Sequence, residues 1–74
     1  MILIHEHLRL IREHFDYSQG FVAKKINISQ SAYARWEKGT TQITFVSLVN
    51  LAEKVYNMNI VDFILWPKKA IISE

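Results

Sequence analysis

The sequence predicts an all-α fold built from five short helices. Apolar residues recur three or four positions apart along most of the chain, which places them on one face of an α-helix. Only two glycines and one proline interrupt the 74 residues, which leaves few points where a helix must break. No segment alternates apolar and polar residues for long enough to predict a strand. Together these observations favour short helices joined by tight turns.

The length and composition of the chain predict one small domain. Half of the residues are hydrophobic, which is enough apolar material for a single core. The chain has no cysteine, which excludes a disulfide or a thiolate-held metal as a staple. Its apolar runs are too short for a signal peptide or a membrane span, so we expect a soluble, cytoplasmic protein. We place the domain at residues 1–66 and a C-terminal tail at residues 67–74.

The first two helices are predicted on either side of the pair Asp16-Tyr17. The first runs to about Phe15, and its apolar stripe consists of Ile4, Leu8, Ile11 and Phe15. Ser18 is the predicted N-cap of the second helix. The apolar stripe of this helix consists of Val22, Ala23 and Ile26. Asn27 tolerates the left-handed conformation that ends a helix, so we expect the turn there.

Three further helices follow with their own start and stop signals. Ser29 caps a helix from about Gln30 to Lys38, with Tyr33 and Trp36 as core positions and Gly39 as its terminator. After a loop, Thr44 caps a fourth helix whose predicted core face is Phe45, Leu48, Leu51, Ala52 and Val55. Asn59 caps a fifth short helix that runs through Leu65 and stops before Pro67.

The connection between the second and third helices has the ingredients of a helix-turn-helix. It is very short, consisting of residues 26–29. Ala23 keeps the first helix thin where the second crosses it, and Asn27 suits a turn with positive φ. The helix that follows exposes short polar residues at its start, as a helix that enters a DNA groove requires.

These residues resemble the Cro/repressor-type (XRE) helix-turn-helix family, whose fold is lambda-repressor-like. The resemblance extends from about Ile4 to Leu65, and its matching positions are Arg12, Ser18-Gln19, Val22-Ala23, residues 26–31, residues 35–39, Leu48 and Leu51-Ala52. The chain departs from the family pattern at Phe21, where a polar residue is usual, at Ala34, where serine is common, and at Asn27, where glycine is usual. The proline that often follows the position of Gly39 is also absent.

The distribution of charge agrees with this resemblance. Residues 18–42 contain four basic residues and one acidic residue, a balance of +3. Residues 1–17 and residues 43–66 each carry −1, while the whole chain carries only +2. The predicted helix-turn-helix is therefore the basic part of a nearly neutral chain, as expected of a segment that contacts phosphates.

The resemblance implies that the third helix enters the major groove of double-stranded DNA. The base-reading positions would be Gln30, Ser31, Ala34 and Arg35. The phosphate contacts would come from Gln19, Ser29, Lys38, Thr40, Thr41 and Gln42, and Gln19 would also brace Gln30. Arg12 and Glu37 match positions that form a structural ion pair in the family.

A single module of this size buries too little surface for strong specificity, so we expect a homodimer on a palindromic operator. The expected dimer or partner surface consists of Ile64, Leu65, Trp66, Ile71 and Ile72, and Ile2-Leu3 could join it as a short strand. One alternative is an antitoxin that binds a toxin and autoregulates its operator. Another is a helix-turn-helix that serves only protein interaction.

The residues predict no enzyme, no cofactor and no small-molecule ligand. No Ser-His-Asp set, glycine-rich phosphate loop or catalytic carboxylate pair is visible. The three histidines do not predict a metal site. His5 and His7 lie on different helix faces, and His7 and His14 are two turns apart.

Overall fold

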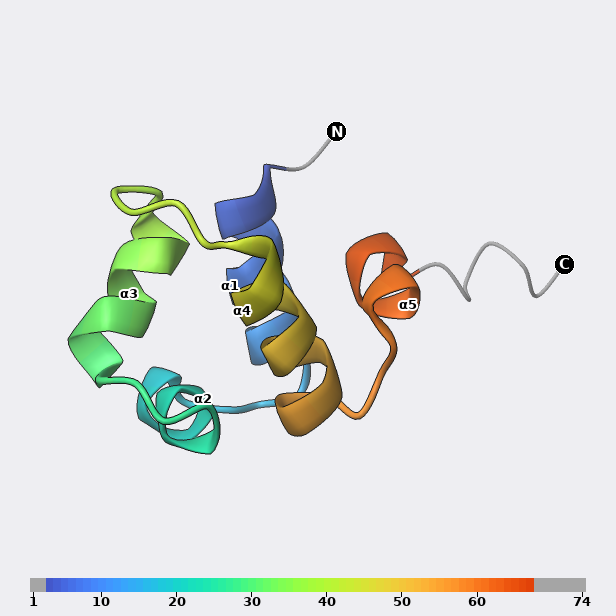
Figure 1. Ribbon diagram of the computed structural model, residues 1–74, viewed down its shortest axis with the longest axis horizontal. Helices are drawn as coiled ribbons and strands as arrows, with labels where there is room; N and C mark the ends of the chain where they lie inside the picture. Colours follow the sequence, from blue (N-terminus) through green and yellow to red (C-terminus); the bar gives the residue numbers. More distant parts are fainter. Residues whose placement is uncertain (1–2, 68–74) are drawn as a thin grey trace, which may run out of the picture.

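The computed structural model describes residues 3–67 and is helical throughout its regular structure (Figure 1). In chain order its elements are α1 (Ile4–His14), α2 (Gln19–Lys25), α3 (Gln30–Lys38), α4 (Phe45–Asn50), the π-helix η1 (Leu51–Val55) and α5 (Ile60–Leu65). Within residues 3–67 there is no strand, and Leu3, at the expected N-terminal strand, instead precedes α1 as its extended N-cap residue. The all-α prediction is confirmed.

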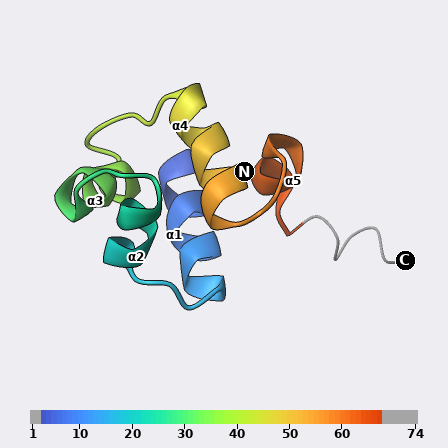
Figure 2. The ribbon, with the colours of Figure 1, turned by 60° about the horizontal axis from the view of Figure 1, so that its bottom comes forward.

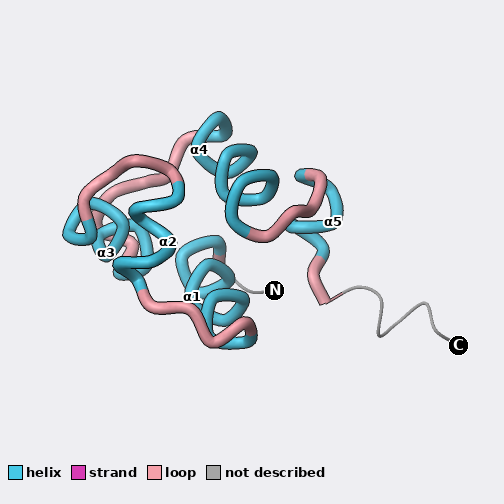
Figure 3. Tube along the Cα trace, turned by 90° about the horizontal axis from the view of Figure 1, so that it is seen from below, coloured by secondary structure: helices cyan, strands magenta, loops and turns pink. Residues whose placement is uncertain are grey.

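The helices surround one core, with α3 and α5 on opposite sides of the molecule (Figures 1 and 2). α1 packs against α3, and α2 packs against both α3 and η1. α5 packs against η1, with α1 and α4 lying between α5 and the helix-turn-helix (Figure 3). The two outermost helices therefore present separate surfaces.

The core draws on every helix except α4. Its largest fully buried side chains are Tyr33, Phe63, Leu8, Ile11, Leu51 and Val22. Each such side chain contributes on the order of 1.5–3 kcal/mol through removal of its apolar surface from water. Two members of the predicted α1 stripe, Ile4 and Phe15, are 36% and 37% exposed because they lie at the two ends of the stripe, where α1 reaches past the core.

All four predicted N-caps are confirmed. In each case a side-chain oxygen accepts a hydrogen bond from the backbone N–H three residues later, over 2.8–3.1 Å. Each cap satisfies an N–H that the first helical turn leaves unpaired, which contributes about 1 kcal/mol. The capping residues are Ser18, Ser29, Thr44 and Asn59.

The prediction that Phe45 belongs to the core is wrong. Phe45 and its neighbour Val46 are 67% and 68% exposed, the highest values among the large hydrophobic side chains described. They form the first turn of α4, which extends beyond the core. The fourth helix becomes half-buried only from Ser47 onward.

The second half of the predicted fourth helix is a π-helix rather than an α-helix. The N–H of Tyr56 donates to the carbonyl of Leu51, five residues earlier, at 3.2 Å. A π-turn holds one more residue than an α-turn. Here Val55 and Tyr56 are both buried at its end.

His7 of α1 caps the C-terminus of α5, a contact that the sequence analysis did not predict. The backbone leaves the helical conformation at Trp66 (ψ 137°), and Pro67 has no N–H to offer the Phe63 carbonyl. The Trp66 N–H donates to that oxygen over a long 3.4 Å. The buried His7 supplies a second, shorter hydrogen bond, because its Nε2 lies 2.7 Å from the oxygen and a carbonyl can only accept. The imidazole also packs edge-on against the Phe63 ring at 5.6 Å. This contact joins the two ends of the described chain.

Candidate nucleic-acid interface

The turn between α2 and α3 has the geometry that the sequence predicts. Asn27 adopts a left-handed conformation with φ of 63°. The N–H groups of Ile26 and Ile28 both donate to the carbonyl of Ala23, at 3.2 and 3.0 Å, which closes the end of α2. Ala23 is 1% exposed. The turn fixes the angle between the two helices.

α3 has two distinct faces. The inner face carries Tyr33 and Glu37, which are buried one turn apart. The outer face carries the predicted DNA-reading positions, of which Gln30, Ser31, Arg35 and Lys38 are exposed and Ala34 is half-buried. Polar side chains, both cationic and neutral, therefore line the side of α3 that faces solvent, where they can form hydrogen bonds with base edges and phosphates.

Gln30 at the start of α3 lies over the start of α2. A Cβ placed on Gly20 would meet the Gln30 side-chain oxygen at 3.5 Å, an ordinary van der Waals contact. Because Gly20 has no side chain, the Gln30 amide lies directly beside the backbone of α2. The first residues of both helices share one edge of the helix-turn-helix.

The remaining predicted phosphate contacts flank α3 at its two ends. The Ser29 hydroxyl caps α3, and the Thr40 hydroxyl donates to the Arg35 carbonyl at 3.3 Å. Thr41 and Gln42 are exposed in the loop that follows. Gly39, with φ of 81°, begins this loop by ending α3 in the left-handed conformation. The loop therefore lies directly beyond the C-terminal end of the outer face of α3.

Arg12 and Glu37 form a bidentate ion pair that the structure buries between α1 and α3. Arg12 Nε donates to Glu37 Oε2 at 2.6 Å, and its Nη2 donates to Oε1 at 3.0 Å. The remaining guanidinium nitrogen, Nη1, donates to the Tyr17 carbonyl at 2.9 Å. The two side chains are 13% and 4% exposed. Each nitrogen of the guanidinium thus has a partner on another segment.

The Gln19 side chain joins this pair instead of extending into solvent. Its amide nitrogen donates to Glu37 Oε1 at 3.0 Å, and the residue is half-buried. The sequence analysis did not predict this contact. The Ser-Gln start of α2 and the Glu-Lys-Gly end of α3 were visible as separate motifs, but nothing in their spacing indicates that Gln19 meets Glu37.

The network determines the protonation of its carboxylate. Burial of Glu37 raises its pKa, but hydrogen bonds with Arg12, Tyr33 and Gln19 oppose burial and leave the pKa below the ordinary value of 4.5. The hydrogen bond with Glu37 raises the pKa of Arg12. Burial raises the pKa of Tyr33, so its phenol stays protonated. The carboxylate is therefore ionised at neutral pH.

Phe21 forms part of an aromatic cluster with Tyr17 and Phe15 beside the start of α2. Its ring lies 4.6 Å from that of Tyr17, which stacks on Phe15 at 5.8 Å. Phe21 is nevertheless 42% exposed, and Lys25 places its ammonium 5.4 Å from the ring centroid. Phe21 thus packs on its own domain and also contributes to its surface.

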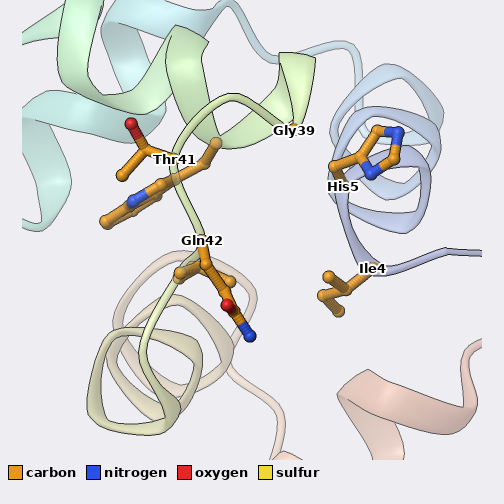
Figure 4. A pocket seen from close by; sticks show the side chains of 7 residues that line it. Ile4, His5, Gly39, Thr41 and Gln42 are labelled. Atoms are coloured by element: carbon orange, nitrogen blue, oxygen red, sulfur yellow. The ribbon is translucent and has the colours of Figure 1, made fainter.

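A pocket of about 210 Å³ separates the start of α1 from the loop after α3 (Figure 4). His5 of α1 faces this loop, and a Cβ on Gly39 would approach its Nδ1 to 3.1 Å. The volume is smaller than that of typical ligand sites. The close approach explains why a glycine suits position 39 on two grounds, its backbone conformation and its contact with His5.

The expected dimer surface is only partly within the described chain. Ile64 and Leu65 on α5 are 42% and 51% exposed, and Val61 beside them is 57% exposed. Trp66 is half-buried, with its ring 5.0 Å from that of His14. Ile71 and Ile72 lie outside the described residues. Ile64 and Leu65 thus form an exposed aliphatic patch on α5 together with Val61, which was not among the expected residues, whereas Trp66 packs against its own domain.

Two other features of residues 3–67 bear on function. No three His, Cys, Asp or Glu side chains in this range gather where they could hold a metal ion. None of its helices has the length and hydropathy needed to cross a membrane.

The tight α2–α3 turn, the polar outer face of α3 and the buried brace behind it define a helix-turn-helix domain of the DNA-binding class. The family model described as Helix-turn-helix matches residues 8–55, from α1 to the end of η1. The chain belongs to this family, in its XRE, or Cro/repressor-type, form. It is a DNA-binding transcriptional regulator, and its ligand is double-stranded DNA. No curated protein and no solved structure matches the chain.

Proposed function

We propose that the protein controls transcription by binding a palindromic operator as a homodimer, with α3 of each subunit in the major groove. The polar outer face of α3 carries this proposal. It offers side chains for base edges near its start and cations toward its end, while Tyr33 and Glu37 hold its other face in the core. An α-helix fits the major groove, where each base pair has a distinct pattern of donors and acceptors.

Sequence readout is assigned to side chains in the first two turns of α3. Gln30 is exposed at the first position of the helix, and its amide can form two hydrogen bonds with adenine. Ser31 and Arg35 share the groove, and Arg35 would select guanine. Ala34 is half-buried and offers a methyl group to thymine. These four side chains set operator preference.

Backbone contacts are assigned to the edges of the helix-turn-helix. Gln19 and Ser29 lie at the starts of α2 and α3, where the helix dipole favours a phosphate. Lys38 and the loop side chains Thr40, Thr41 and Gln42 lie at the other end of α3. These contacts fix the register of α3 and carry the dependence of affinity on salt.

Dimerisation is assigned to the aliphatic patch on α5. Val61, Ile64 and Leu65 belong to a six-residue helix that buries Phe63 and leaves these three side chains between 42% and 57% exposed. Because α5 lies on the opposite side of the subunit from α3, self-association through α5 leaves both reading helices exposed (Figure 1).

Selection of bound sites from a pool of random duplex DNA tests this function. The expected product is a palindrome whose half-sites are about 10–10.5 base pairs apart, one helical turn. A single half-site without symmetry would contradict the dimer. Recovery of no sequence, with no binding even at low salt, would contradict operator recognition.

An antitoxin function is the second candidate, favoured by the exposed pair Phe45 and Val46. These side chains are two-thirds exposed on α4, apart from the patch on α5. A toxin would cover such a surface while α3 binds the operator. Co-purification of a toxin with the protein from its native cell, abolished by Phe45→Ser and Val46→Ser together, is the expected result. Co-purification that survives both substitutions would contradict a toxin site at this pair.

A further inference from the structure

We infer that Glu37 is a positioning residue for DNA binding, because its carboxylate fixes the orientation of the Gln19 amide at the DNA-facing edge of α2. The inference rests on the proposed phosphate contact of Gln19. It assigns to the buried ion pair a role in binding as well as in folding.

The geometry of the carboxylate carries this inference. Glu37 Oε1 accepts from both Arg12 Nη2 and Gln19 Nε2, each at 3.0 Å, while Oε2 accepts from Arg12 Nε. A carboxylate can only accept hydrogen bonds, so the amide of Gln19 must turn its nitrogen toward Glu37. One amide hydrogen and the carbonyl oxygen of Gln19 then remain for other partners.

The position of Gln19 connects the orientation of its amide to DNA binding. Gln19 is the first residue of α2 and precedes Gly20, where an added Cβ would contact the Gln30 side chain. Glu37, in the last turn of α3, thereby fixes a side chain at the same edge as the first base-reading residue. A side chain held before binding loses less conformational entropy when it meets a phosphate.

Burial makes the restraint strong. The Glu37 side chain is only 4% exposed, so water does not compete effectively for its oxygens. Arg12 is itself fixed by its bond to the Tyr17 carbonyl. The amide of Gln19 thus rests against a rigid charged partner, not against a mobile surface residue.

Glu37→Gln is the informative substitution because it keeps the size of the side chain. A neutral amide replaces one carboxylate oxygen with a donor nitrogen, which faces a donor of Arg12 at either position and the amide of Gln19 as well at the Oε1 position. With the nitrogen at the Oε1 position, Gln19 has to turn its own nitrogen away. With the oxygen there, Gln19 keeps only a hydrogen bond to a neutral acceptor, which is weaker than a bond to a carboxylate. The substitution also removes a negative charge, which by itself would strengthen DNA binding.

The first measurement follows the side-chain amide of Gln19 by NMR in the absence of DNA. We expect one of its two protons to be shifted downfield and protected from exchange in the wild type, and both the shift and the protection to decrease in Glu37→Gln. Glu53→Gln, which removes an exposed charge on η1, is the matched control and should leave the signal unchanged. An unprotected Gln19 amide in the wild type would overturn the inference without affecting the proposed function.

The second measurement compares the affinities of the wild type, Glu37→Gln, Gln19→Ala and the double variant for a selected operator duplex, at a temperature where each is folded. We expect Glu37→Gln to weaken binding about tenfold, equivalent to 1.4 kcal/mol, and to have little effect when Gln19 is already alanine. Glu53→Gln should bind as well as the wild type or better.

The outcomes separate the inference from the function on which it rests. Equal losses from Glu37→Gln with and without Gln19 would mean that Glu37 supports only the fold, and would overturn the positioning role while operator binding stands. Normal binding by Gln19→Ala would remove Gln19 from the phosphate contacts and the inference with it. Failure of the wild type to bind any duplex would instead refute the proposed function.

Discussion

At the scale of single residues, the buried carboxylate of Glu37 connects three segments of the chain. It accepts hydrogen bonds from α1 and from the start of α2 while it belongs to α3. Removal of one partner from a buried pair leaves an uncompensated charge, which costs about 3–5 kcal/mol. The pair is therefore a point at which small chemical changes have large effects on stability.

Glu37 should make the stability of the protein depend on acid pH. Because its pKa in the folded state is below the ordinary value of 4.5, its contribution is complete above that value and decreases as the pH falls through the folded pKa. Urea unfolding between pH 2.5 and about pH 7 is the measurement. We expect the decrease to be shallower in Glu37→Gln than in the wild type, and Glu13→Gln, an exposed control, to keep the wild-type slope. Identical slopes for the wild type and Glu37→Gln would contradict the ionised, hydrogen-bonded carboxylate.

At the scale of secondary-structure elements, α3 carries the proposed base-reading and phosphate-binding side chains on one exposed face. Gln30 lies at its first position and Lys38 at its last. A side chain that reads bases and one that contacts phosphate contribute differently to affinity, because only the first depends on sequence.

Gln30→Ala and Lys38→Ala should therefore have distinct effects. We expect Gln30→Ala to lose preference for the operator while it keeps much of its binding to random DNA. Lys38→Ala should weaken both equally and reduce the slope of log K against log salt by about one unit. Titrations at several salt concentrations with both duplexes measure these effects. An equal loss on both duplexes for Gln30→Ala, or an unchanged slope for Lys38→Ala, would remove that residue from its assigned role.

α5 is an element whose C-terminal end depends on a side chain from α1. We expect His7→Phe, which keeps an aromatic ring but removes the shorter of two hydrogen bonds to the Phe63 carbonyl, to destabilise the protein by about 0.5–1.5 kcal/mol. Amide hydrogen exchange should become faster by a larger factor in α5 than in α3. His14→Phe is the matched control, since His14 is exposed and packs edge-on against Trp66. Equal effects of the two substitutions would show that the His7 hydrogen bond contributes nothing.

The elements also show which parts of the fold can be predicted from the sequence alone. Local signals predict the caps and the turn correctly, because the bond from a cap such as Ser18 and the left-handed backbone at Asn27 depend on the residue itself and its neighbours. The exposure of Phe45 was missed because helical spacing does not reveal where the core ends. The bond from His7 to Phe63 spans 56 positions, and no local pattern encodes such a distance.

At the candidate site, too, some features could be predicted from the sequence and others depend on how the helices pack. The resemblance places Arg12 and Glu37 at matching positions, and the structure brings them into contact. The resemblance assigns Gln19 to phosphate, but the bond from Gln19 to Glu37 depends on how α2 crosses α3 and could not be predicted from their separate motifs. The base-reading and phosphate assignments remain predictions that DNA-binding measurements test.

At the scale of the whole molecule, α3 and α5, which carries the aliphatic patch, lie on opposite sides (Figure 3). A two-fold dimer pairs the same patch on both subunits. If α5 is that patch, the interface keeps both copies of α3 exposed and sets the distance between them. The separation of half-sites in the operator then depends on how the two α5 helices pack.

Leu65→Glu should convert the dimer into a monomer, because it places a charge within an apolar interface. Sedimentation equilibrium measures the association, and operator affinity should decrease with it. Val46→Glu, a substitution at an equally exposed apolar residue on α4, is the control and should leave association unchanged. A dimer that survives Leu65→Glu would contradict the assignment to α5, and a monomeric wild type would contradict the dimer itself.

The two tryptophans occupy opposite sides of the same molecule. Trp36 belongs to α3 and lines the pocket beside the loop after it, whereas Trp66 follows α5 and packs against the rings of His7 and His14. Each indole thus lies on, or directly after, the element that carries one of the two proposed contact surfaces. With either tryptophan replaced by phenylalanine, fluorescence from the other should follow DNA binding or subunit association separately, without any attached dye.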